Sequence, residues 1–116
     1  MLKEEAIDRL TLDIERKGDT AIVRCSGQLV LGVTNFLYEN VHPLISESKH
    51  IVLDLTDLTH MDSMGIGTVV RLYVSAKSAG CTLELINIGK RIRDLLGVTH
   101  LLSMFSVCGE QGIRMP

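Results

Sequence analysis

The sequence has little of what a nucleic-acid-binding or membrane-spanning protein needs. Two Phe, two Tyr and no Trp among 116 residues leave few rings on which bases could stack. Twelve basic and fourteen acidic side chains give a formal net charge of −2, and no basic block could follow a phosphate backbone. No apolar run reaches the roughly 18 residues of a membrane-spanning helix. We therefore expect neither nucleic acid nor a membrane as partner.

Cysteine is also scarce. Cys25, Cys81 and Cys108 are far apart, form no C-x-x-C pair and have no histidine at metal-ligand spacing. We expect reduced, mostly buried thiols, with no metal and no cofactor. The N-terminus has no apolar segment of signal-peptide length, so the expectation is a soluble, cytoplasmic protein.

The chain opens with a pattern of strands. Residues 10–16 alternate between apolar and polar side chains, and a short turn separates them from a second strand over 21–26. So short a connection predicts an antiparallel hairpin. We expect residues 1–9 to be an N-terminal arm, 10–108 a single domain and 109–116 a flexible tail.

Helices and strands alternate after the hairpin. Thr34 would cap a helix that kinks or breaks near residues 39–42, because Pro43 removes a backbone hydrogen bond. The apolar run at 50–56 predicts a central strand with parallel neighbours. The remaining predicted elements are an amphipathic helix from Ser63 to Ala79-Gly80, a strand over 81–87, a short helix from Lys90 to Gly97 and a short strand over 105–107.

This order of elements predicts an α/β sandwich. Its mixed sheet would have four to five strands, with helices packed mainly on one face. If the strands at 50–56 and 81–87 are parallel, their carboxyl ends share one edge of the sheet. The loops over 56–63 and 87–90 would then be neighbours at that edge.

Ser63 stands where a strand leads into a helix, and it is either a helix cap or a chemical switch. Capping by Ser or Asp is worth about 1 kcal/mol. It does not explain Gly65 and Gly67, each of which costs ~0.5–1 kcal/mol relative to Ala, whereas close approach by another backbone or a partner would. A phosphate on Ser63 would meet free N–H groups and the positive end of the helix dipole, and would add roughly −1.5 to −2 charges.

Two kinds of catalytic or signalling site are excluded by their motifs. The nucleophile elbow of esterases needs Gly-x-Ser-x-Gly, but residue 61 is Met, and His60 is better interpreted as a solvent-facing turn residue than as a general base. Asp54 resembles the phosphorylated aspartate of receiver domains, yet those domains do not open with a hairpin. We expect Asp54 to fix the loop through hydrogen bonds to backbone N–H groups. No P-loop is present, so we expect a binding protein and not an enzyme.

Several segments together resemble the STAS domain of the anti-sigma factor antagonist family. They are Ile51-Val52-Leu53-Asp54-Leu55, Met61-Asp62-Ser63-Met64-Gly65-Ile66-Gly67, Ala79-Gly80, Leu83-Glu84-Leu85-Ile86-Asn87 and Arg93-Asp94-Leu95-Leu96. The likeness runs from about Leu10 to Val107. It implies a small partner of a serine kinase that doubles as an anti-sigma factor, with Ser63 as the phosphate acceptor. The unphosphorylated form would bind the kinase and free the sigma factor, and a metal-dependent serine phosphatase would reset it.

The resemblance also suggests which residues serve the site. Asp62, Gly65, Gly67 and Asp54 would support the phosphorylated loop. The candidate partner contacts are Gln28, Val30, Met64, Thr68, Arg71, Asn87 and Lys90, of which Val30 and Met64 replace an acid and a small hydroxyl residue found in many family members. The alternative is a scaffold or small-ligand-binding domain in a signalling complex, without reversible phosphorylation. A weak homodimer is compatible with either function.

Overall fold

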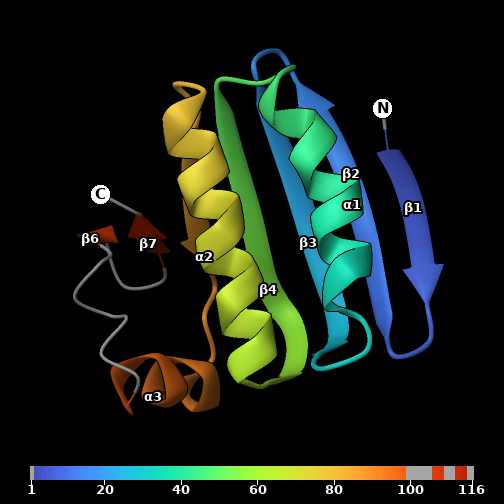
Figure 1. Cartoon of the computed structure of the whole chain (residues 1–116), viewed down its shortest axis with the longest axis vertical. Coiled ribbons are helices and arrows are strands. Elements are labelled where there is room, and N and C mark those ends of the chain that lie inside the picture. The colour runs from blue at the N-terminus through green and yellow to red at the C-terminus, as the bar shows by residue number, and fades with distance from the viewer. Residues whose placement is uncertain (1, 99–105, 109–111, 115–116) are drawn as a thin grey trace.

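The computed structural model describes residues 2–98, 106–108 and 112–114, which form a helix-and-sheet sandwich (Figure 1). In chain order the elements are β1 (Leu2–Ile7), β2 (Leu10–Lys17), β3 (Thr20–Leu29), α1 (Thr34–Ile45), β4 (His50–Met61), α2 (Ser63–Ser78), β5 (Thr82–Ile86), α3 (Lys90–Val98), β6 (Ser106–Cys108) and β7 (Gly112–Arg114). The strands of the described residues form one sheet in the order β1-β2-β3-β4-β5-β7-β6. The predicted α/β sandwich with a mixed sheet is confirmed.

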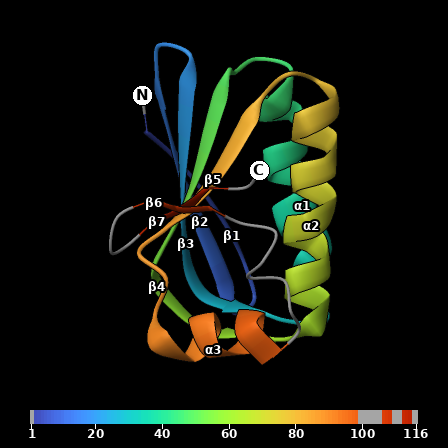
Figure 2. The ribbon, with the colours of Figure 1, turned by 90° about the vertical axis from the view of Figure 1, so that its left-hand side faces the viewer.

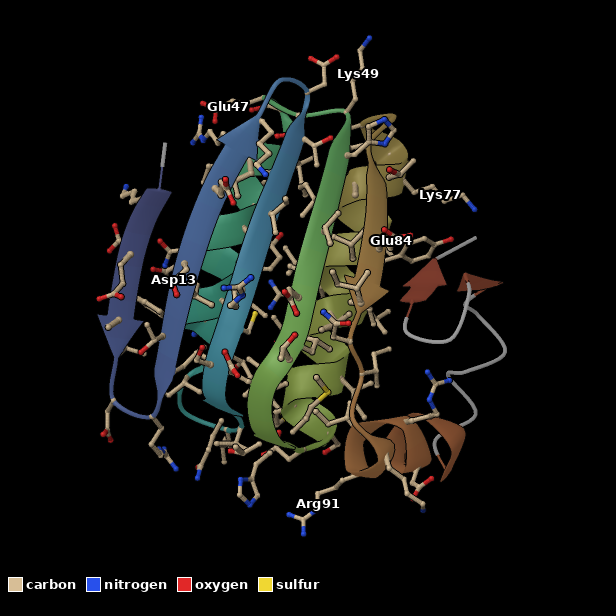
Figure 3. The ribbon with its side chains drawn as sticks, turned by 180° about the vertical axis from the view of Figure 1, so that it is seen from behind. Asp13, Glu47, Lys49, Lys77, Glu84 and Arg91 are labelled. Carbon is tan, nitrogen blue, oxygen red and sulfur yellow. The ribbon has the colours of Figure 1, made fainter. Side chains whose placement is uncertain are left out.

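The sheet changes from antiparallel to parallel at β3. Strands β1, β2 and β3 pair antiparallel, whereas β3, β4 and β5 pair parallel, as the hairpin and the apolar central strand predicted. Helices α1 and α2 lie side by side over one face, and α3 lies at the end of the sheet where α2 begins (Figures 1 and 2). In the described part of the chain, no helix covers the opposite face (Figure 3).

The core lies between the sheet and the two long helices. Every second residue of the central strands points into it, and fully burying one such aliphatic side chain contributes ~1.5–3 kcal/mol. Its largest fully buried members are Leu10, Leu12, Leu29, Leu37, Ile51, Leu53, Leu55, Leu72, Leu83, Leu85 and Val23. Cys25 and Cys81 are free, buried thiols in this core. Burial and the charge of Asp54 raise the pKa of Cys25 to about 12, and burial also raises the pKa of Cys81.

Both ends of the chain contribute strands that the sequence pattern did not reveal. The segment expected to be an N-terminal arm contains β1, and all six residues of β1 pair with β2. A tight turn joins the two strands, and in it Arg9 has a φ of +75°. Charged side chains obscured the alternation of β1. Gly112–Arg114, expected to be part of a flexible tail, form β7 and pair with Glu84–Ile86.

Helix α1 differs from its prediction in two ways. Its N-cap is Val33 and not Thr34, and no side chain makes a capping hydrogen bond. The helix also continues through Pro43 to Ile45 without the expected break. Pro43 stands in the last turn on the exposed side, so its missing N–H leaves one carbonyl group that solvent can reach.

Strand β4 is five residues longer than predicted, because its partner β3 also continues, to Leu29. Two register shifts let β4 carry two more residues than β3 over this stretch, since Arg24 pairs with Asp54 but Leu29 pairs with Met61. Such bulges bend a strand and change where its next side chains point. The bulged end of β4 therefore determines how Asp62 and Ser63 leave the sheet.

Candidate functional site

Ser63 is the first residue of α2, and its side chain is exposed. The helix is capped by Asp62, whose Oδ1 accepts a hydrogen bond from the N–H of Gly65 (3.0 Å). The other oxygen, Oδ2, accepts from the N–H of Leu31 (2.9 Å) in the loop between β3 and α1. Among the described residues the Ser63 hydroxyl has no hydrogen-bond partner. Asp62 thus does the capping that the sequence could also have assigned to Ser63, and it leaves the Ser63 hydroxyl free.

Asp62 is held in its charged form by this geometry. Its partial burial alone would raise the pKa of the carboxyl group. Hydrogen bonds from the N–H groups of Leu31, Gly65 and Met64 outweigh burial and keep the pKa below its ordinary value. The ionised carboxylate links the β3–α1 loop to the first turn of α2.

The two glycines of the first turns have different surroundings. A Cβ at Gly65 would overlap the carbonyl oxygen of Leu29, so the absence of a side chain lets α2 begin directly against the end of β3. This is the close backbone approach that the sequence suggested. Gly67 is exposed, and a Cβ there would meet nothing within 4 Å. Nothing in the described part of the chain requires a glycine at position 67.

Apolar side chains flank Ser63 on the surface. Leu31 is 65% exposed and Met64 is 49% exposed, although large apolar side chains are usually buried. We use the name Ser63 surface for Leu31, Ser63, Met64 and Gly67. Leu31 was not named as a contact from the sequence, although it lies between the predicted contact Val30 and Gly32.

Two of the other predicted contacts lie on β3 or directly after it. Gln28 is half-buried and its N–H donates to the carbonyl oxygen of Arg9 (2.7 Å), which ties the β1–β2 turn to β3. Val30 is partly buried and packs against the core. The backbone of Gln28 and Val30 therefore contributes more to the structure beside the Ser63 surface than their side chains do.

Asp54 does not support the Ser63 loop, contrary to expectation. It lies in the first half of β4, where Oδ1 accepts hydrogen bonds from the N–H (3.0 Å) and hydroxyl of Thr56 and from the side-chain amide of Asn87 (3.1 Å). Arg24 of β3 lies 3.4 Å from Oδ2. The expected bond to a backbone N–H is present, but it stabilises the first bulge of β4 and the end of β5.

The network also fixes the charge of Asp54. Asp54 is only 5% exposed, and burial by itself would raise the pKa of its carboxyl group. The hydrogen bonds from Thr56, Asn87 and Arg24 outweigh burial and lower the pKa below its ordinary value.

Asn87 and Lys90 form no hydrogen bond or ion pair with the Ser63 loop in the described part of the chain. The half-buried Asn87 has a φ of +57° and uses its amide on Asp54. Lys90 is exposed at the start of α3, where its ammonium group lies 2.8 Å from Asp94 and that contact raises the pKa of Lys90. The predicted neighbourhood of the two loops is therefore found in part: the second loop is tied to β4 at Asp54, and α3 packs against β4 at the end of the sheet where α2 begins.

Thr68 and Arg71 of α2 both have structural contacts. Thr68, a predicted partner contact, is buried, because α2 packs against α1 as well as against the sheet. Its hydroxyl donates to the carbonyl oxygen of Met64 (3.0 Å). The exposed Arg71 places its guanidinium group 4.2 Å from the ring centroid of Tyr38 in α1.

Other catalytic or binding features are few. His60 is exposed, as expected, but it lies in β4 and not in a turn, with Nδ1 3.0 Å from the Thr59 hydroxyl. Over the described ranges, no group of three or more His, Cys, Asp or Glu side chains is arranged to hold a metal ion. No helix within those ranges combines the length and the apolar character needed to cross a membrane.

Comparisons with known proteins agree with this geometry. The model of the STAS domain family matches residues 11–111. The anti-sigma-B factor antagonist of Bacillus subtilis is 24% identical over 101 residues, which cover 87% of this chain and 93% of the relative. An anti-sigma factor antagonist from Mycobacterium paratuberculosis has a similar crystal structure, with a TM-score of 0.77, 18% identity and 90% of each chain covered. The phosphorylated form of the Bacillus cell fate determinant SpoIIAA matches with a TM-score of 0.60 and 18% identity over 87% of this chain and 85% of its own. The chain belongs to the STAS domain family.

Proposed function

We propose that this protein is an anti-sigma factor antagonist controlled by phosphorylation of Ser63. In its unphosphorylated form it binds a serine kinase that acts as an anti-sigma factor, and so releases a sigma factor for transcription. The kinase phosphorylates Ser63, and a metal-dependent serine phosphatase removes the phosphate. The role agrees with the name of the Bacillus subtilis relative, and a protein of the same fold has been solved in a phosphorylated form. Such a cycle places the protein in the cytoplasm.

The free, exposed hydroxyl of Ser63 is the observation that carries the proposal. Asp62 holds the first turn in place, so the acceptor is presented on a fixed backbone. A phosphate there would lie at the positive end of α2 and bring roughly −1.5 to −2 charges between two exposed apolar side chains, Leu31 and Met64. A partner that buries those side chains would then have to desolvate the phosphate, which explains how the modification reverses binding.

Gly67 supports a partner at this place. It costs helix stability without serving any contact in the described chain, and it leaves open space one turn after Ser63. A partner backbone could approach the helix closely there. The chemistry of transfer belongs to the kinase, whose nucleotide and Mg²⁺ neutralise the phosphoryl group.

The first test is intact-mass spectrometry with site mapping on the protein isolated from its native cells. We expect a phosphate-sized mass on Ser63 that disappears after phosphatase treatment. Ser63→Ala should then capture an anti-sigma factor kinase and Ser63→Asp should not. Ser78→Asp, an exposed serine at the other end of the same helix, is the control and should bind like the unmodified protein. Absence of phosphate from Ser63 under every growth condition tried would refute the proposal.

A scaffold without reversible phosphorylation is the second candidate, and the exposed Leu31 and Met64 favour it. Such side chains bind a partner whether or not a phosphate is ever attached. In that case Ser63→Ala and Ser63→Asp should bind the same partners with similar affinity.

A further inference from the structure

The outer edge of β1 is a regular, unpaired strand edge. β1 stands at the end of the sheet order, and all six of its residues pair with β2 without a bulge. Within the described chain no strand pairs with its other side, and Figure 1 shows no helix in front of it. A regular edge of this length offers backbone N–H and C=O groups to a further strand.

The helical layer stops before it reaches β1. A groove of about 650 Å³ lies beside α1, and Lys3, Arg16 and Pro43 are among the residues that line it. The register places Lys3 opposite Ile14 and Glu5 opposite Leu12, so Lys3 and Glu5 point to the helix side of the sheet. Glu4, between them, points to the helix-free side.

The charges of β1 are arranged to match a second copy of β1. Lys3 and Glu5 carry opposite charges on one face and lie 3.2 Å apart as an ion pair. When a two-fold axis perpendicular to the sheet relates the two copies, the helix sides of both sheets face the same way. Lys3 and Glu5 of one copy are therefore opposite residues on the helix side of the other copy. Centred on Glu4, the axis brings each Lys3 opposite the Glu5 of the other copy.

Other registers are less favourable. Moving the axis to Glu5 sets the two Glu5 side chains against each other and leaves Lys3 opposite Ile7. The Glu4-centred register has two opposite-charge pairs and one like-charge pair, Glu4 with Glu4. Opposite charges across a strand pair stabilise it and like charges destabilise it.

We propose that β1 pairs antiparallel with β1 of a second copy, centred on Glu4, so that the two sheets join into one. The grooves beside α1 of the two copies then meet across the axis. The interface is five residues of one strand from each copy, Leu2 to Ala6, so it belongs to the smallest class of interfaces and the dimer is weak, with a Kd on the order of 0.1–1 mM. The start of α2, which carries Ser63 and Met64, lies on the far side of α1 from this edge and stays free in the dimer (Figure 1).

Sedimentation equilibrium from about 10 μM to about 2 mM protein tests the dimer and its charges. Lys3→Glu should weaken dimerisation about tenfold, and adding Glu5→Lys should restore it, because the two cross-strand pairs return with their signs exchanged. Glu4→Gln should strengthen it severalfold. Lys49→Glu, the same charge change at the residue before β4, is the control (Figure 3). A monomer at every concentration, or variants indistinguishable from the unmodified protein, would overturn the proposal.

Cross-linking tests the register independently. In a Cys108→Ser background, Glu4→Cys should form a disulfide-linked dimer with oxidised glutathione, because directly opposite residues have Cβ atoms ~4.5–5.5 Å apart. Ala6→Cys should not, because Ala6 is opposite Leu2 in this register. The buried Cys25 and Cys81 do not compete. Equal cross-linking of both variants would contradict the Glu4-centred pairing. That result would leave the edge of β1 available to a strand of another protein.

Discussion

At the scale of single residues, Gly65 and Gly67 should respond in opposite ways to the same substitution. Gly65→Ala forces a Cβ against the Leu29 carbonyl oxygen and should lower the free energy of unfolding by about 2–3 kcal/mol. Gly67→Ala meets open space and should raise it by ~0.5–1 kcal/mol, because alanine favours the helix. Urea denaturation of both variants measures the difference. If the two had equal effects, the close approach of α2 to β3 would be wrong.

The same pair of residues shows how much of the site could be predicted. The sequence places Ser63 at a helix start and raises the question of why two glycines follow it. It cannot answer that question separately for Gly65 and Gly67, because the answer depends on where β3 ends. The prediction that Asp54 supports the Ser63 loop was wrong for a related reason. The sequence could indicate that Asp54 bonds to a backbone N–H group, but it could not show that β4 continues beyond Asp54.

At the scale of the elements, the contact between α1 and α2 includes a cation over a ring. The Arg71 guanidinium group lies 4.2 Å from the Tyr38 ring centroid, and Tyr38 stacks on His42 at 5.0 Å. Arg71→Ala should therefore lower the free energy of unfolding by about 0.5–1 kcal/mol. A double-mutant cycle with Tyr38→Leu measures the coupling, which should account for most of that loss. Zero coupling would leave Arg71 as a surface residue available to a partner, as the sequence first suggested.

Elements whose periodicity is complete were predictable from sequence. The helix from Ser63, the strand at 81–87 and the hairpin have regular apolar spacing, and each is present. Elements that depend on pairing with neighbouring strands could not be predicted from the sequence. β1 is mostly charged and is a strand because β2 offers it an edge, and β4 is long because β3 is long. α1 continues through Pro43 because that residue stands in the last turn, where only one bond is lost.

At the scale of the whole molecule, Asp54 joins β3, β4 and the end of β5 through Arg24, Thr56 and Asn87. Its pKa is lowered in the folded state. The carboxylate therefore contributes stability that is complete above the pKa of the unfolded chain, about 3.9, and is lost as the pH falls through the lower folded value. Removing the charge of Asp54 should therefore lower the free energy of unfolding most near neutral pH.

Asp54→Asn should lower the free energy of unfolding by about 2 kcal/mol at neutral pH, since a buried, charged acceptor of several hydrogen bonds is lost. The difference from the unmodified protein should shrink as the pH falls below about 4, where the unmodified protein loses the same contribution. Urea denaturation at a series of pH values follows both proteins. Asp13→Asn is the control: Asp13 lies in β2 on the same face of the sheet as Asp54 and forms no hydrogen bond or ion pair with the described residues, so the substitution should change stability little at neutral pH (Figure 3). A gap between Asp54→Asn and the unmodified protein that stayed constant down to acid pH would mean that the charge of Asp54 does not hold the three strands together.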